Sequence, residues 1–587
     1  MFALPKVSKI AHTKGVRKLW SVANSSNPVL TNAISECSSK LAKSVAPYAN
    51  SKKYLTPNVL RDCYIFALIS NSYSASEISS FGEIVNDSLS KIFKIDANFS
   101  NKADSPNLSK NTVGSHSSSD SFFNFANSKY PFPNVYGTVV DQVLNSSGIL
   151  KSSGISLMFY NNHFKSDNSF DPEISSSFNS IDGLIPVPFS FEADSSRENL
   201  NFNSVGKWYS PKDSMPIMNN ESVFPSSISN GFNQTTDSPS STWSFFESVS
   251  KAEFRLNLPE NLNQLLQQKD KKEAKLFLLF SDNEPTQFLE LLDNKFPSAA
   301  KYGLVGSQTP FINGQDFSLI YKNELKPKGI YGVAFYSDQT STPNHDLKIS
   351  VSYPGFILIG KPALVTRSRG NIILEIENTS GVEWLKDNIE IAIKITKIKH
   401  TTHEPYARFI SEKESEHSDV AYSITGGDPK RGGISIDTKN EIVSGNQYIQ
   451  MMYPDPNYSS EISDEMKMKD DKQKSRIFRN ENTNDSQILA SFGVTNKQQA
   501  RSISKEFIEN DNGTTREASQ STSCSNSLKE HSHVFGGSTE LGFYFANSAD
   551  KSRNNKSVYN ICNSPTDCSV PNSFSNLIIP RSTKNIK

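Results

Sequence analysis

Between residues 242 and 398, short apolar runs alternate with turns of glycine, proline and asparagine. Runs of this length with many β-branched and aromatic residues are typical of β-strands rather than helices. The strands predicted here span residues 274–280, 302–305, 317–321, 329–336, 349–351, 365–366, 372–376 and 389–395. Further strands are predicted at residues 421–424, 434–436, 448–452, 534–537 and 541–545. Because glycine turns connect successive runs directly, the pattern favours a largely antiparallel sheet.

Helical periodicity flanks an apolar run near the N-terminus. Apolar residues recur at helical spacing from residue 30 to 37 and again over residues 75–93. Between them, residues 63–70 have the sequence CYIFALIS, which is continuously apolar and predicts a buried strand. Two more helices are predicted at residues 258–273 and 285–295. Helices mixed with strands in this way predict an α/β mixed (α+β) fold, with helices packed on the sheets.

Long polar stretches interrupt these elements. Residues 97–245 consist mainly of Ser, Asn, Asp and Pro, with a predicted strand at 154–160 and a predicted turn and short helix at 130–144. Residues 457–530 are charged and polar without periodicity, and residues 548–587 are poor in apolar side chains. Such compositions bury too little apolar surface to offset chain entropy. We therefore expect long Ser/Asn-rich disordered insertions at about 97–245 and 457–530, and a polar tail at 548–587.

The composition excludes several functional classes. Lys and Arg together number 61, as do Asp and Glu, so the formal net charge is zero and no overall field attracts nucleic acid. No run of about 18 or more apolar residues occurs, so the sequence predicts no membrane span. The five cysteines are few, odd in number and scattered, which is typical of a reducing compartment rather than of a secreted disulfide framework.

The first residues form a basic segment without acidic side chains. Met1 to Trp20 contains five Lys or Arg residues, and the first acidic residue is Glu36. Apolar side chains roughly oppose the basic ones on a helical wheel, although Pro5 disfavours a helix. This composition predicts a mitochondrial transit peptide over residues 1–24 and hence a mitochondrial location. The alternative is an ordinary basic tail on a cytoplasmic protein.

Four glycine-containing motifs follow one another along the chain. They are GLVGSQTPF at residues 303–311, GKPALVTRSRGNIILEI at 360–376, GDPKRG at 427–432 and STELGF at 538–543. Each is a turn between strands, so the order of the motifs matters more than any one of them. In this order they resemble the FIST domain family, a proposed small-ligand sensing module. Residues 66–70, FALIS, resemble an element of its N-terminal half, an apolar strand that ends in Ser before a helix.

The resemblance implies two similar-sized, strand-rich halves. A FIST N-terminal half would span residues 25–376 and a C-terminal half residues 377–547, each interrupted by one of the long insertions. The resemblance also implies that the protein senses a small ligand or binds a protein partner in signal transduction, without catalysis of its own. An F-box, which some members carry, is not evident. Leu258-Pro259 resembles its opening, but the hydrophobic helices that should follow are missing.

The predicted ligand-binding residues lie in a cleft between the two halves. They are Ser307, Thr309, Arg367, Asp428 and Arg431. Exposed backbone around residues 307–311 would line the pocket, and the Arg431 guanidinium could bind a carboxylate in bidentate fashion. Structural interpretations stay open for the same positions. Gly306 fits a turn or bulge, and Asp428 before Pro429 fits the brace of a tight turn.

The sequence assigns no metal, cofactor or reaction. His400 and His403 do not have the order of a zinc motif, and His531 with His533 supplies only half a site. No Ser-His-Asp, Cys-His or paired-carboxylate arrangement can be assembled with any specificity. The ligand therefore stays an unidentified small molecule or protein partner. Two alternative functions remain open: a cytosolic substrate adaptor or scaffold of F-box-related type, and an enzyme of unknown reaction.

Overall fold

The structure, a computed structural model, describes residues 20–49, 63–93, 133–145, 150–161, 184–192, 257–267, 272–282, 285–338, 347–397, 404–411, 419–438, 442–445, 447–455, 486–495, 534–546, 566–571 and 573–580. These residues form four sheets and the helices that pack on them, so the predicted α+β class is confirmed. Three sheets have six strands each, and the fourth has seven.

Sheet 1 has the strand order β1-β6-β2-β3-β10-β11. Its strands are β1 (Trp20–Ser25), β6 (Ile155–Asn161), β2 (Cys63–Ser70), β3 (Asn134–Val140), β10 (Leu319–Tyr321) and β11 (Glu324–Lys326). The third and fourth strands, β2 and β3, run parallel and are connected through helices, whereas all other neighbours are antiparallel. The predicted antiparallel character thus holds except at one strand pair.

Sheets 2 and 3 repeat this arrangement strand for strand. Sheet 2 consists in order of β7 (Ile185–Phe191), β12 (Ile330–Asp338), β8 (Lys272–Ser281), β9 (Ala300–Val305), β23 (Phe543–Ala546) and β24 (Thr566–Cys568). Sheet 3 consists in order of β13 (Lys348–Ser352), β25 (Phe574–Pro580), β21 (Ser486–Val494), β22 (Phe535–Thr539), β4 (Gln142–Leu144) and β5 (Leu150–Lys151). In both, only the third and fourth strands are parallel.

The last two strands of every sheet come from a different part of the chain. Repeat 1 supplies β1 to β6, repeat 2 supplies β7 to β12, and repeat 3 supplies β13 and β21 to β25. The hairpin β4–β5 of repeat 1 completes sheet 3, the hairpin β23–β24 of repeat 3 completes sheet 2, and the hairpin β10–β11 of repeat 2 completes sheet 1. The exchange is cyclic, because each repeat completes the sheet of another.

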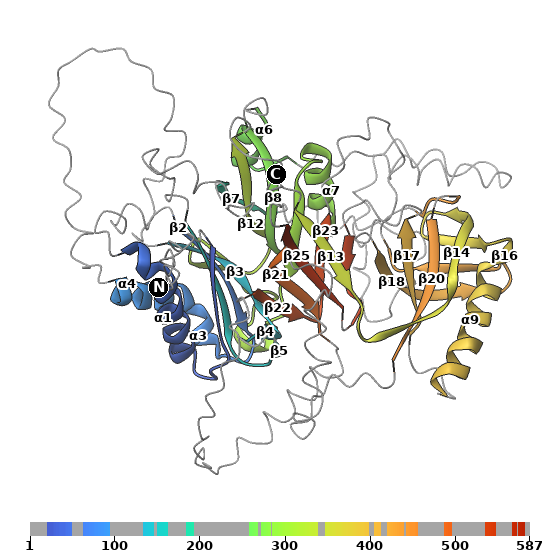
Figure 1. Ribbon diagram of the computed structural model, residues 1–587, viewed down its shortest axis with the longest axis horizontal. Coiled ribbons are helices and arrows are strands. Elements are labelled where there is room, and N and C mark those ends of the chain that lie inside the picture. The colour runs from blue at the N-terminus through green and yellow to red at the C-terminus, as the bar shows by residue number, and fades with distance from the viewer. Residues whose placement is uncertain are drawn as a thin grey trace, which may run out of the picture.

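Helices cover the outer faces of sheets 1 and 2. The helices α1 (Leu30–Ala49), α3 (Ala75–Ser79) and α4 (Phe81–Phe93) pack on sheet 1, where residues such as Ile34, Ile65 and Val85 form one buried cluster (Figure 1). The helices α6 (Glu260–Gln267) and α7 (Thr286–Lys295) pack on sheet 2 in a second cluster. The inner faces of all three sheets contribute to a third, shared cluster.

An aromatic residue followed by glycine marks the fourth strand of each sheet. The pairs are Tyr136-Gly137 in β3, Tyr302-Gly303 in β9 and Phe535-Gly536 in β22. All three rings are fully buried in the shared cluster. A Cβ atom at Gly137 would stand 1.8 Å from the carbonyl oxygen of Ala67, and one at Gly536 would stand 2.3 Å from that of Ser491. Both oxygens belong to the parallel neighbour strand, so glycine permits the close approach there.

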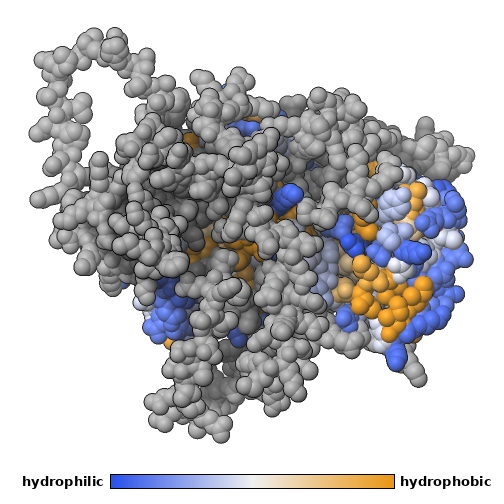
Figure 2. Space-filling model, viewed as in Figure 1, coloured by the Kyte–Doolittle hydropathy of each residue, from blue (hydrophilic) through white to orange (hydrophobic). Residues whose placement is uncertain are grey.

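The fourth sheet is a closed barrel inserted into repeat 3, between β13 and β21. Its order is β14 (Phe356–Arg369), β20 (Gln447–Pro454), β17 (Tyr406–Ser411), β18 (Val420–Asp428), β19 (Gly433–Ile436), β15 (Ile372–Ile376) and β16 (Thr379–Ser380). Pairing of β14 with β15 closes the barrel. The helix α9 (Gly381–Thr396) packs against it (Figure 1). Figure 2 shows apolar surface on the barrel, where Leu358 of β14 and Ile391 and Ile395 of α9 are exposed.

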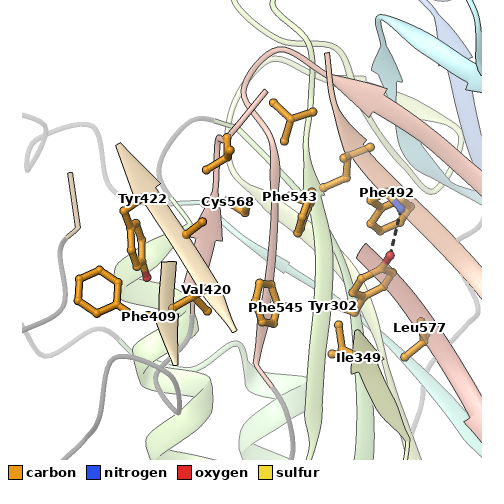
Figure 3. Close-up of a cluster of buried hydrophobic side chains, with 14 of the residues drawn as sticks. Tyr302, Ile349, Phe409, Val420, Tyr422, Phe492, Phe543, Phe545, Cys568 and Leu577 are labelled. Carbon is orange, nitrogen blue, oxygen red and sulfur yellow. Dashed lines mark hydrogen bonds between the residues drawn. The ribbon is translucent and has the colours of Figure 1, made fainter. Parts of the chain in front are cut away.

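The barrel and the three sheets share apolar core. Figure 3 shows Phe409 and Tyr422 of the barrel in the same buried cluster as Phe543 of β23 and the stacked pair Tyr302–Phe492, whose ring centroids are 4.6 Å apart. The Tyr302 hydroxyl accepts a hydrogen bond from the backbone N–H of Phe492 at 3.1 Å. Strands of sheets 2 and 3 are thereby fixed against each other, and the barrel continues their core.

A buried ion pair connects α7 to β9. Lys301 is fully buried, and its ammonium donates to Asp293 Oδ1 at 2.8 Å and to the carbonyl oxygen of Phe296 at 2.7 Å. Burial lowers the pKa of Lys301, while the Asp293 carboxylate opposes that change. Because a lone buried charge is unstable, the two residues depend on each other.

Several predicted elements are confirmed and others are wrong. The strand at residues 63–70 and the helices at 75–93 and 285–295 are confirmed. The predicted strand at residues 389–395 lies in α9, and the predicted turn and helix at 130–144 are the strands β3 and β4. In α9, Ser380 caps the first turn by accepting from the Glu383 N–H, and the buried side chains follow a helical spacing, so packing overrides the alternating isoleucines.

The predicted polar regions contain parts of the folded core. The insertion predicted at about 97–245 includes β3, β4, β5, β6 and β7, and the one at about 457–530 includes β21. Most of their other residues lie outside the described part of the chain. The tail at 548–587 contains β24 and β25. The proposed boundary between two halves at residue 376 falls inside the barrel, because β14 and β15 pair with β20 and β19 beyond it. Three repeats and a barrel replace the two halves.

Candidate functional site

Three residues at equivalent positions end the fourth strands of the three sheets. Counted from the aromatic residue, the sixth position is Asp141 in repeat 1, Ser307 in repeat 2 and Glu540 in repeat 3. The Asp141 N–H donates to the carbonyl oxygen of Ser538 at 3.0 Å, and the Ser307 N–H donates to that of Val139 at 2.9 Å. Each bond joins the sixth position of one repeat to the fourth position of another. We name Asp141, Ser307 and Glu540 the strand-end ring.

Polar residues from the neighbouring parallel strands surround this ring. Asn71 follows β2 and Thr495 follows β21, and both continue the hydrogen bonding of their strand pair. The Asn71 amide donates to Asp141 Oδ1 at 2.8 Å, and the Thr495 hydroxyl donates to the Ser538 hydroxyl at 3.0 Å. The ring thus lies at the carboxyl ends of parallel strands, which is the edge where open α/β sheets bind ligands.

Asp141 has an unusual electrostatic environment. Burial raises the pKa of Asp141 from 3.8 to about 6, and the negative charge of Glu540 adds to the rise. Hydrogen bonding to the carboxyl from the Ser307 hydroxyl, the Glu540 backbone N–H and the Thr495 hydroxyl opposes it. Asp141 Oδ2 is buried and has no hydrogen-bond partner among the described residues. The carboxyl is therefore ionised at neutral pH but close to titration.

Ser307 also presents an unsatisfied polar atom. Its side chain is 1% exposed, and its hydroxyl oxygen has no hydrogen-bond partner within the described part of the chain. Buried polar atoms without partners are uncommon in folded proteins, and each one calls for an explanation. Here the hydroxyl lies beside the Asp141 carboxyl and lowers the pKa of that carboxyl, so the two groups can bond to each other.

Two of the predicted site residues lie on the loop that starts at the ring. Ser307 belongs to the ring, whereas Thr309 is fully buried and its hydroxyl bonds the Ser318 hydroxyl at 2.9 Å and the Gln315 carbonyl oxygen at 3.0 Å. Thr309 therefore holds the loop together. Phe311 on the short helix α8 (Pro310–Asn313) has a fully exposed side chain. This loop is available to contact a molecule that reaches the ring.

The other three predicted residues lie on the barrel. Arg367 is exposed and pairs with Glu375 at 3.0 Å. Arg431 and Asp428 form an exposed pair at 3.7 Å, and Asp428 Oδ1 accepts the backbone N–H of Lys430 at 2.9 Å, so the predicted turn brace is confirmed. Among the described residues, no hydrogen bond or ion pair joins these three to Ser307 or Thr309. The geometry therefore supports Ser307 and Thr309 as neighbours of a site. The three barrel residues belong to turns and strand pairs.

The sequence analysis missed Asp141 and Glu540. Asp141 lies in the predicted turn and short helix at 130–144, and Glu540 lies between the predicted strands at 534–537 and 541–545. Neither residue adjoins Ser307 in sequence. A signal was present, because an aromatic-glycine pair is followed by a polar residue at the sixth position in YGTVVD, YGLVGS and FGGSTE. Six-residue similarities of this kind are too short to indicate a repeat without the strand order.

Comparisons with known proteins do not assign the chain to a family: no family model matches it, and no curated protein matches it. Across the described residues, no set of three or more His, Cys, Asp and Glu side chains is placed to hold a metal ion. No described helix has both the length and the apolar character needed to cross a membrane. The geometry of the ring therefore carries the functional argument.

Proposed function

We propose that this chain is a ligand-sensing protein related to FIST domains, that it works without catalysis, and that its small ligand binds at the strand-end ring. The resemblance of the ordered motifs supports the functional class. The observation that supports the location is the buried polar pair of Ser307 and Asp141 at the carboxyl ends of parallel strands. Burial of the ionised Asp141 carboxyl costs stability, which is typical of a functional site.

Substituting the ring should abolish ligand binding without unfolding the protein. Ser307→Ala removes a hydroxyl that has no partner among the described residues, so we expect little loss of stability. A set of polar metabolites is screened by the rise in melting temperature of the full chain. A ligand present at 100 times its Kd adds about 2.7 kcal/mol of stability. We expect at least one compound whose effect is lost in Ser307→Ala and kept in Glu375→Gln, a control on the barrel.

Two results would contradict this proposal. If every stabilising compound acted equally on Ser307→Ala and on the unmodified protein, the ring would not be the site. If a bound compound were recovered chemically changed, the protein would be an enzyme, the alternative that the sequence leaves open.

The proposed mitochondrial leader must be shorter than residues 1–24. Strand β1 begins at Trp20 and pairs with β6 through all six of its residues, and Ala23 is fully buried. Removal of residues 20–24 would therefore take an edge strand from sheet 1. We propose that residues 1–19 direct import and that the folded protein starts with β1.

Import should depend on the basic residues of this segment. The full chain with a C-terminal fluorescent tag is expected in mitochondria, and both a version lacking residues 2–19 and one with all five basic residues changed to Gln are expected in the cytosol. The second version keeps the length of the segment and tests charge alone. A cytosolic signal from the unmodified chain would refute mitochondrial import and favour the cytosolic adaptor or scaffold.

A further inference from the structure

One aromatic side chain stands in full contact with solvent on the connection between β9 and β10. It belongs to Phe311 of α8, and its side chain is fully exposed. In repeats 1 and 3 the next strands, β4 and β23, follow the strand-end ring almost at once, whereas the connection of repeat 2 runs from Ser307 to Ser318. We name residues 307–318 the Phe311 loop.

Hydrogen bonds within the Phe311 loop fix its shape, in addition to those of its buried threonine described above. The Asn313 amide donates to the Ser318 hydroxyl at 2.8 Å, and Asn313 Oδ1 accepts from the Gln315 N–H at 3.2 Å. Ile312, next to Phe311, packs against the buried cluster beneath sheet 1. A loop that is already ordered loses little entropy when it binds, so burial of the Phe311 ring by a partner would be favourable.

The barrel carries the other exposed apolar surface. Asn388 of α9 lies against β14, because a Cβ atom at Gly360 would stand 2.5 Å from Asn388 Oδ1. Leu358 lies two residues before Gly360, and Ile391 and Ile395 lie about one and two helical turns beyond Asn388. Leu358 is 47% exposed and Ile395 is 57% exposed. Figure 2 shows apolar surface on the barrel, and we name Leu358, Ile391 and Ile395 the barrel patch.

The charges beside these two surfaces are complementary. Asp316 is the one charged residue of the Phe311 loop, and it is exposed. Lys394 and Lys397 are exposed at the end of α9, next to the barrel patch. Among the described residues, none of these three side chains forms an ion pair. A loop without Lys or Arg is poorly suited to an anionic membrane or to nucleic acid, but it suits a surface that carries lysines.

We propose that the Phe311 loop of one copy of this chain binds the barrel patch of a second copy, with the Phe311 ring on the exposed isoleucines of α9. The large apolar side chains that are exposed in the described part of the chain are those of Phe311, the barrel patch and Val29, so one chain supplies both halves of the contact. Because the two surfaces differ, the association is head to tail and forms open chains or rings. This inference goes beyond the proposed function and does not depend on the strand-end ring.

Sedimentation equilibrium of the full chain between about 5 and 200 µM tests the association, since a contact of so few residues belongs to the small, transient class. We expect the average mass to rise with concentration. Phe311→Ser and Ile395→Glu should each weaken the association about tenfold or more, because each removes an apolar side chain that the contact buries. Val29→Ser removes an exposed apolar side chain outside both surfaces and should leave the association unchanged.

A mixing experiment distinguishes a head-to-tail contact from other arrangements. Phe311→Ser retains the barrel patch and Ile395→Glu retains the Phe311 loop, so each variant alone should be monomeric while their equimolar mixture should form dimers that grow no further. Near-UV circular dichroism checks that both variants are folded.

Three results would overturn the inference. The first is a monomer mass for the unmodified chain over the whole range of concentration. The second is association that Ile395→Glu abolishes and Phe311→Ser leaves intact, because the barrel patch would then pair with itself. The third is a monomeric chain that floats with phosphatidylserine vesicles and is released by Ile395→Glu, which would assign the patch to a membrane surface.

Discussion

Replacing Asp293 by alanine is expected to lower the free energy of unfolding by about 3–5 kcal/mol. The Lys301 ammonium is fully buried, and its other contact is the Phe296 carbonyl oxygen. Without Asp293 this charge has no counter-ion in the described surroundings of α7 and β9. The protein must then bury a lone charge or release a proton from Lys301, whose pKa burial already lowers. Urea unfolding followed by circular dichroism measures the loss.

Two companion variants separate the lost pair from ordinary mutational damage. In Asp293→Leu combined with Lys301→Met, both charges are replaced by apolar groups, and we expect most of the stability to return. Glu375→Ala breaks the Arg367–Glu375 pair, whose side chains are 65% and 41% exposed, and should cost less than about 1 kcal/mol. A loss below about 1 kcal/mol for Asp293→Ala itself would show that water or another group compensates Lys301.

Replacing Asp141 by asparagine is expected to stabilise the protein at pH 8. The pKa of Asp141 is raised from 3.8 in the unfolded chain to about 6 by burial, so the folded state binds the proton more tightly. Stability therefore falls as pH rises from about 4 to 6 and stays reduced above that range. The shift corresponds to about 3 kcal/mol, since each pKa unit is worth about 1.4 kcal/mol. Asparagine has the same shape and never ionises, so it avoids this cost.

The gain in the free energy of unfolding of Asp141→Asn should depend on pH. Unfolding curves of Asp141→Asn and the unmodified protein at matched pH should differ most at pH 7–8 and converge below about pH 3, where Asp141 is protonated in both states. In a Glu540→Gln background the gain should shrink, because the charge of Glu540 contributes to the raised pKa of Asp141. A difference that stays constant from pH 4 to pH 8 would show that the carboxyl does not titrate as the structure indicates.

The sequence predicted the local elements where burial and periodicity agree. Residues 63–70 are apolar throughout, so the strand β2 follows from composition alone. Residues 486–494, SQILASFGV, form the equivalent strand β21 of repeat 3, yet this short apolar run lies between long polar stretches and was included in the predicted insertion. The alternating isoleucines of 389–395 suggested a strand, but Trp384, Asn388 and Ala392 pack one face of a helix. Tertiary packing decides both cases.

The candidate site was only partly predictable for a topological reason. Ser307 was identified from a motif near a glycine turn, which is a local feature. Its neighbours Asp141 and Glu540 come from other repeats, and they meet Ser307 only because hairpins are exchanged between sheets. Strand order of this kind depends on pairings between distant parts of the chain, which local periodicity does not encode.

The cyclic exchange of hairpins has a consequence for how the chain is made. The hairpin β4–β5 lies near residue 145, but its partner β22 lies at Phe535–Thr539, close to the end of the chain. During synthesis, repeat 1 leaves the ribosome long before the strands that this hairpin needs, so an unpaired edge persists until translation is nearly complete. Sheet 3 therefore cannot be completed until repeat 3 has been synthesised. Under the proposed mitochondrial import, this delay would leave part of the fold incomplete when the chain reached the translocase.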